Sequence, residues 1–159
     1  MNIVTAPQTV IGFHGCDHDI AERLLDGLPF HTSTNDYDWL GSGIYFWEYA
    51  PYRAWDWARQ RHGARAAVLC AEISLGDCLN LLDTNYFADL QAVHAQIIST
   101  LEEMSVAPPE NSRGANRLDR FVLDEFNKRY ASRAGFFDTV RGCFPEGLPL
   151  YKGSKLLSR

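Results

Sequence analysis

The segment from Asp36 to Trp57 holds most of the side chains that could form a flat binding site. It contains nine aromatic residues, and all four tryptophans of the chain are among them: Tyr37, Trp39, Tyr45, Phe46, Trp47, Tyr49, Tyr52, Trp55 and Trp57. Flat aromatic walls bind flat ligands by stacking and by excluding water. The same concentration of rings is compatible with a small aromatic core, so the pattern alone leaves both interpretations open.

A glycine motif lies inside this aromatic segment. Gly41 and Gly43 bracket a serine just before Ile44–Trp47, which is expected to be an aromatic strand. Glycine permits positive φ angles and lets a ligand approach the backbone closely. Because the motif lacks the later glycine and the strand-before-helix context of a dinucleotide fingerprint, it does not predict a Rossmann site.

His14 and Gly15 form a second motif. They follow Thr9–Phe13, a β-branched and apolar run that predicts a short strand ending at these two residues. An imidazole there would lie at a sheet edge beside exposed backbone amides, although a lone histidine is more often only structural. An extended chain would place His14, Cys16 and His18 on one face, but no further ligand lies nearby, so no metal site is expected.

The order of these motifs resembles ADP-ribosyltransferases of the poly-ADP-ribose-polymerase and diphtheria-toxin type, whose signature is His, Tyr and a later Glu. The shared features are His14-Gly15, a helix, a Ser/Thr-containing turn, Gly43-Ile-Tyr-Phe46 and a helix with an alanine at Ala54. The resemblance covers roughly Val10–Asp83 and is weaker over Asp138–Tyr151. Small bacterial or phage-type members look especially similar over Leu40–Glu48, Ala71–Gly76 and Cys78–Asp83.

The resemblance implies that the site binds NAD as a substrate. His14 would hydrogen-bond the adenosine-side ribose, and the Gly15 backbone would pair with the nicotinamide carboxamide. Tyr45 would stack on the nicotinamide ring, in keeping with the preference of a flat cationic ring for an aromatic face. Ser33 or Thr32 would contact a ribose or a phosphate, and Gly43 would let the ligand approach the backbone.

The chain departs from the family pattern in two places. Arg53 stands where the related enzymes have a serine, and a guanidinium there suits a pyrophosphate, while Trp55 or Trp57 could supply a second ring wall. The family's catalytic glutamate lies on a strand near the C-terminus, where this chain has little room for one. Glu146 is the nearest acidic candidate; Glu72 and Glu48 are weaker ones.

The implied reaction is cleavage of the nicotinamide–ribose bond through an oxocarbenium-like transition state, in which Tyr45 holds the leaving group and Glu146 supplies negative charge. The ADP-ribose would pass to an unknown macromolecular acceptor, protein or nucleic acid, as in toxins and effectors with a cognate inhibitor protein. Two alternatives stay open. One is a catalytically inactive NAD or ADP-ribose-binding module on the same fold, and the other is a protein-interaction domain.

Composition limits the architecture that positions these residues. At 159 residues, with 46% hydrophobic and 22% charged residues, the chain predicts one ordered domain spanning 1–159. A net charge of −5 argues against nucleic-acid binding through bulk electrostatics. We find no signal peptide and no apolar run near the ~20 residues of a membrane span, which favours a cytoplasmic protein with no membrane partner.

The expected elements alternate between strands and helices. The class is therefore α+β, with a mixed or antiparallel split β-sheet flanked by helices, as in ADP-ribosyltransferases. Helices are predicted from Asp17 or Asp19 to Gly27, from Pro51 to Arg61 with Gly63 as the stop, over Thr84–Met104 and over Leu118–Tyr130. Further strands are predicted over Val68–Leu75, where Cys70 is expected to be buried, and over Phe136–Phe144.

Overall fold

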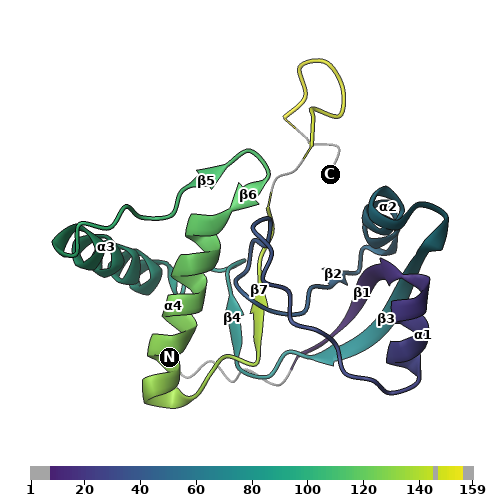
Figure 1. Ribbon diagram of the computed structural model, residues 1–159, viewed down its shortest axis with the longest axis horizontal. Helices are drawn as coiled ribbons and strands as arrows, with labels where there is room; N and C mark the ends of the chain where they lie inside the picture. The colour runs from purple at the N-terminus through teal and green to yellow at the C-terminus, as the bar shows by residue number, and fades with distance from the viewer. Residues whose placement is uncertain (1–7, 145–146, 156–159) are drawn as a thin grey trace.

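A computed structural model describes residues 8–144 and 147–155 of the chain (Figure 1). The mixed α+β class is confirmed. In chain order the elements are β1 (Thr9–Asp17), α1 (His18–Leu25), β2 (Trp47–Glu48), α2 (Pro51–His62), a 3-10 turn (Gly63–Arg65), β3 (Ala66–Ser74), β4 (Cys78–Asn80), α3 (Phe87–Glu103), β5 (Asn111–Ser112), β6 (Ala115–Asn116), α4 (Arg117–Ala134) and β7 (Thr139–Arg141).

β1 is the central strand of a three-stranded antiparallel sheet with the order β2-β1-β3. It pairs with β3 over nine consecutive positions, from Thr9 opposite Ser74 to Asp17 opposite Ala66. The predicted end of this strand at His14-Gly15 is therefore wrong, because pairing with β3 carries the strand three residues past His14. Cys70 of β3 is exposed rather than buried, because alternate residues of that strand face solvent.

Local sequence signals set the ends of the two helices that flank this sheet. The Asp17 carboxylate accepts a hydrogen bond from the Asp19 amide at 2.9 Å, which caps the start of α1. The chain leaves α1 at Gly27, whose φ is +89°. α2 begins at Pro51 and ends before Gly63, as expected. Because Ala54 and Ala58 of α2 are fully buried, this helix packs closely on the sheet.

The second half of the molecule is built around β4 and β7, which form a separate parallel pair. Figure 1 shows α3 and α4 on the far side of this pair from the β1 sheet. Leu79, Leu123, Phe126 and Phe137 form its buried core, with partly buried side chains packed around them. β5 and β6 form a third, two-stranded sheet. The last strand spans only Thr139–Arg141 of the expected Phe136–Phe144.

An ion pair joins the two sheets. The Arg141 guanidinium of β7 binds the Glu48 carboxylate of β2 through two hydrogen bonds of 2.6 Å each, and both side chains are about a quarter exposed. This contact assigns Glu48, a weak candidate for catalysis, to a structural role. Within residues 8–144 and 147–155, none of the helices has the length and apolar character needed to span a bilayer.

Candidate functional site

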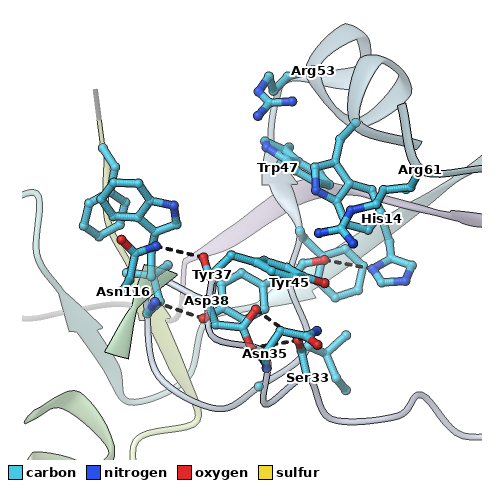
Figure 2. A pocket seen from close by; sticks show the side chains of 18 of the residues that line it. His14, Ser33, Asn35, Tyr37, Asp38, Tyr45, Trp47, Arg53, Arg61 and Asn116 are labelled. Atoms are coloured by element: carbon cyan, nitrogen blue, oxygen red, sulfur yellow. Dashed lines mark hydrogen bonds between the residues drawn. The ribbon is translucent and has the colours of Figure 1, made fainter. Parts of the chain in front are cut away.

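A cleft of about 790 Å³ opens between the β1 sheet, α2 and the segment 31–46, which we call the cleft loop (Figure 2). Its volume falls in the range typical of small-molecule sites. The β5–β6 hairpin and the residues after β7 close its far end. Six predicted cofactor-binding residues line it, namely His14, Gly15, Ser33, Gly43, Tyr45 and Arg53. Trp55 is not among the lining residues, and Glu146 lies outside the described residues.

The His14 imidazole is fixed by a hydrogen bond from Nδ1 to the backbone carbonyl of Tyr45, at 2.8 Å. A carbonyl oxygen only accepts, so Nδ1 carries the proton and Nε2 of the neutral ring is an acceptor. Phe30 and Phe46 pack against the same ring, with centroids 5.3 and 5.4 Å away. His14 therefore presents an oriented acceptor suited to a hydroxyl donor, such as a sugar hydroxyl.

Strand alternation places the backbone groups of Gly15 at an open sheet edge. The Gln8 carbonyl accepts from Leu75 on the β3 side, whereas the Ile11 carbonyl accepts from Tyr49 on the β2 side. The register with β3 is continuous, so every second residue after Ile11 also directs its N–H and C=O toward β2. β2 pairs no further than Phe13. Gly15 thus offers an adjacent donor and acceptor, the pair that a carboxamide needs.

Helix packing explains why residue 15 is a glycine. A Cβ atom built there would lie 2.6 Å from the Ala54 carbonyl oxygen and 3.2 Å from the Ala58 Cβ. It would also lie 3.3 Å from the Trp57 ring. α2 can approach β1 this closely only because the side chain is missing, and the same approach brings Trp57 to the cleft.

Tyr45 closes the cleft loop on itself instead of continuing a strand. Its hydroxyl donates to the Gly41 carbonyl at 2.5 Å and accepts from the Leu40 amide at 2.9 Å. Burial raises the pKa of this hydroxyl well above its usual range, and the negative charges of Asp38 and Asp124 act in the same direction. The hydroxyl is therefore a structural group. The predicted strand over Ile44–Trp47 is wrong, because only Trp47 belongs to β2.

Contacts from α4 hold both ends of the turn formed by residues 34–42. Arg117 donates to the Asp36 carboxylate at 2.7 Å and lowers the pKa of that carboxyl, and Arg120 donates to the Thr34 carbonyl. At the other end, the Asp124 carboxylate accepts from the amide and the hydroxyl of Ser42 at 2.7 and 2.9 Å. α4 thus positions the loop that carries Tyr45.

Ser33 and Gly43 are brought together by backbone pairing across the cleft loop. Each amide donates to the carbonyl of the other residue, at 2.7 and 3.1 Å. The Ser33 hydroxyl donates to the Asp38 carboxylate, which also accepts from the Asn35 amide at 2.8 Å. Asp38 is 3% exposed, so this buried carboxylate stabilises the turn through several hydrogen bonds.

One face of α2 supplies the wall opposite the cleft loop. Arg53, Trp57 and Arg61 follow one another at intervals of four residues, and all three line the cleft. The Arg53 guanidinium lies 5.5 Å from the Trp47 ring, and Arg61 lies over Trp57 and Tyr37. Trp55 cannot share this face, because two residues along a helix correspond to about 200° of rotation.

A second cavity of about 300 Å³ continues from the cleft past His14 and Gly15. The two cavities also share His31 and Trp57. Apolar side chains from α1 and from the segment that follows it line one part of the second cavity, namely Ile20, Leu24, Leu28, Pro29 and Phe30. An extended ligand held at His14 can therefore reach both spaces.

Two of the acidic candidates from the sequence, Glu48 and Glu72, do not line this cleft. Glu48 binds Arg141, and Glu72 is exposed on β3 rather than buried. Among the described residues that line the cleft, Asp38 carries the one carboxylate. His14 and His18 also have different neighbours, since His18 lies 3.7 Å from Glu22 on α1.

Sequence reasoning missed several residues that line the cleft, among them Asp38, Arg61, Asn116 and Phe144. Arg61 carried a usable signal, because it lies one helical turn after Trp57 and two after Arg53. Asn116 donates its side-chain amide to the Tyr37 carbonyl at 2.9 Å, and Phe144 packs on Trp39 with centroids 4.5 Å apart. Both contacts are distant in sequence, and no local pattern predicts them.

Comparison with known proteins gives one distant similarity. The chain is similar to an uncharacterized protein of Methanocaldococcus jannaschii, with 26% identity over an alignment 159 positions long that covers 92% of this chain and 69% of the archaeal one. No protein-family model matches the sequence. No solved structure matches it either.

Proposed function

We propose that this protein is an ADP-ribosyltransferase that cleaves NAD at the nicotinamide–ribose bond and transfers ADP-ribose to a macromolecular acceptor. The observation that carries the proposal is the convergence of His14, Gly15 and Tyr45 on one cleft. The Nδ1 atom of His14 bonds the backbone of Tyr45, 31 residues away in the chain. This order of motifs resembles ADP-ribosyltransferases in sequence, and the fold brings the three residues together.

Each of these residues has a chemical role in the proposed reaction. The Nε2 atom of His14 accepts a hydrogen bond from a hydroxyl of the adenosine-side ribose, and the N–H and C=O of Gly15 pair with the nicotinamide carboxamide. The Tyr45 ring, rather than its hydroxyl, contacts the nicotinamide. Holding the ribose and the leaving group in a fixed geometry lowers the barrier to formation of an oxocarbenium-like transition state.

The proposal is tested with NAD labelled in the adenine ring, with and without a cell lysate as a source of acceptor. Chromatography measures the released nicotinamide, and the label follows the ADP-ribose. Tyr45→Phe keeps the ring but loses the hydroxyl that bonds Leu40 and Gly41, so it should retain part of the release rate, whereas Tyr45→Ala should abolish release. Transfer of label to a macromolecule identifies the acceptor class. Equal rates in Tyr45→Ala and the wild type would remove Tyr45 from the proposal.

A second candidate function is a catalytically inactive module that binds NAD or ADP-ribose. One observation favours it: Asp38, the one lining carboxylate among the described residues, is already bonded to Ser33 and Asn35. Glu146→Gln separates the two candidates. A large drop in nicotinamide release at unchanged NAD affinity supports the enzyme with Glu146 as its acid. Saturable binding with no release in the wild type supports the module.

A further inference from the structure

Arg61 is exposed as a residue, and its guanidinium lies over two aromatic rings of the cleft. Its central carbon lies 4.4 Å from the ring centroid of Tyr37 and 5.4 Å from that of Trp57. Figure 2 shows the side chain directed from α2 into the cleft, toward the loop that carries Tyr37 and Tyr45. Both distances fall in the cation–π range, so two walls of the cleft fix the position of one cation.

Arg61 differs from three other arginines of the described residues in its charge environment. Arg65, Arg117 and Arg141 each pair with a carboxylate. Within the described part of the chain, Arg61 has no such ion pair. Aromatic rings cover the faces of a guanidinium and leave its N–H groups at the edge, where they can bind an anion in a bidentate manner. Arg61 therefore presents a positioned charge to an anionic ligand.

The position of Arg61 along α2 indicates which anionic group of the ligand its guanidinium would contact. The Trp57 ring would lie 3.3 Å from a Cβ atom built at Gly15, so Trp57 is next to the part of the cleft that contains His14 and Gly15. Arg61 follows Trp57 by one helical turn. Arg53 lies on the other side of this contact with Gly15, eight residues or about 12 Å from Arg61 along the helix, next to Ala54, whose carbonyl oxygen is 2.6 Å from the same Cβ site. The two arginines therefore flank Gly15, and the contacts with Tyr37 and Trp57 distinguish Arg61. In a dinucleotide whose ribose binds His14, the diphosphate is attached to that same ribose.

We infer that Arg61 binds the diphosphate of the ligand and is a specificity-determining residue of the cleft, in the role that the sequence suggested for Arg53. This inference rests on the proposed function, because it uses the ribose contact of His14 to place the diphosphate. The bidentate fork matters as well as the charge, since phosphate oxygens match the spacing of guanidinium N–H groups.

The experiment compares ADP-ribose with adenosine, which lacks the diphosphate, on matched variants. Arg61→Gln and Arg59→Gln remove the same charge from the same helix, but Arg59 does not line the cleft. Arg61→Gln should weaken ADP-ribose binding by about tenfold or more, as expected for loss of a charge-assisted contact, and should leave adenosine binding within about twofold. Arg59→Gln should leave both within about twofold. Arg61→Lys should give an intermediate loss. Calorimetry measures ADP-ribose, and ligand-observed NMR measures adenosine.

The possible failures are distinguishable. If ADP-ribose binds and Arg61→Gln weakens adenosine as strongly as ADP-ribose, Arg61 acts through the packing of Tyr37 and Trp57 and the inference is wrong. The same conclusion follows if the two glutamine variants behave alike. If the wild type binds neither nucleotide, the proposed function fails, and titration with inorganic diphosphate decides the anion site. If inorganic diphosphate binds the wild type but not Arg61→Gln, the anion site at Arg61 is supported. If diphosphate does not bind the wild type, the anion site is refuted. Thermal unfolding of each variant checks that it folds.

Discussion

Replacing Gly15 by alanine places a methyl group where α2 already contacts β1. The added Cβ would lie 2.6 Å from the Ala54 carbonyl oxygen, an atom of the helix backbone that cannot rotate away. Ordinary contact begins near 3.4 Å, so α2 would have to withdraw by about 0.8 Å. Because Trp57 and Arg61 are on the same helix, this withdrawal would also move one wall of the cleft.

Two opposing contributions determine the expected change in the free energy of unfolding. Inserting a methylene into a packed contact typically costs about 1–3 kcal/mol. Replacing a glycine reduces the backbone entropy of the unfolded chain, which stabilises the folded state by about 0.4–1 kcal/mol. Gly15→Ala should therefore destabilise the protein by about 1–2 kcal/mol. For a chain of this size, that corresponds to a decrease in Tm of about 2–8 °C.

Gly43→Ala is the matched control. A Cβ at Gly43 meets no atom within 4 Å, and the residue does not have a positive φ. Its Tm should stay within about 2 °C of the wild-type value, while the methyl group enters the cleft and lowers ligand affinity. Thermal unfolding followed by far-UV circular dichroism measures both variants. If Gly15→Ala were as stable as Gly43→Ala, the close packing of α2 on β1 would be refuted.

Three further predictions concern the supports of the cleft and the acid sensitivity of the fold. Asp124→Ala removes the two carboxylate oxygens that accept hydrogen bonds from Ser42, so it should lower the free energy of unfolding in urea by about 1 kcal/mol and weaken ligand binding. Glu125→Ala, which loses a contact with Lys128, should leave ligand binding unchanged. A double-mutant cycle on Glu48 and Arg141 should give a coupling energy of about 1–2 kcal/mol, because the contact is bidentate and partly buried. This value exceeds the coupling energy of a typical surface ion pair. A coupling energy near zero would show that this ion pair does not join the two sheets. Hydrogen bonds from Arg65 and Arg117 hold the pKa values of Asp17 and Asp36 below the usual range of an aspartate, so the two carboxylates stabilise the fold above that range and this contribution is lost as the pH falls through the lowered values. Arg117→Gln should therefore be less stable than the wild type at pH 6, and the difference in stability should disappear at the lowest pH where both proteins fold. A difference that is constant with pH would exclude the Asp36 contribution.

Local signals in the sequence predict several element boundaries correctly. Proline at the start of α2 and glycines just after α1 and α2 mark helix ends, because their backbone preferences are intrinsic to the residue. The capping aspartate Asp17 acts through the amide of a residue two positions away. Such features need no knowledge of the rest of the fold.

Boundaries that depend on partners distant in sequence were not predictable in the same way. β1 runs past His14 because β3 continues opposite it, and β4 and β7 pair through residues about sixty positions apart. The stretch around Tyr45 has the composition of a strand. It forms a loop because the Tyr45 hydroxyl bonds Leu40 and Gly41, and because Asp124 of α4 holds Ser42.

In the candidate site, too, local spacing predicted some features and contacts distant in sequence determined the others. Helical spacing on α2 separates Trp57, which lines the cleft, from Trp55, which is 42% exposed and does not. That distinction was available from the sequence by counting residues per turn. The hydrogen bonding of Asp38 and the placement of Asn116 beside Tyr37 required the folded arrangement, since each depends on how the cleft loop closes.

The proposed function requires that this cleft binds NAD through His14, Gly15 and Tyr45. Calorimetric titration of NAD into the wild type, His14→Ala, Tyr45→Ala and Trp55→Ala measures this binding. We expect saturable binding to the wild type, at least about tenfold weaker binding to the first two variants, and binding to Trp55→Ala within about twofold of the wild type. Absence of binding at millimolar NAD, or equal losses in all three variants, would contradict the account.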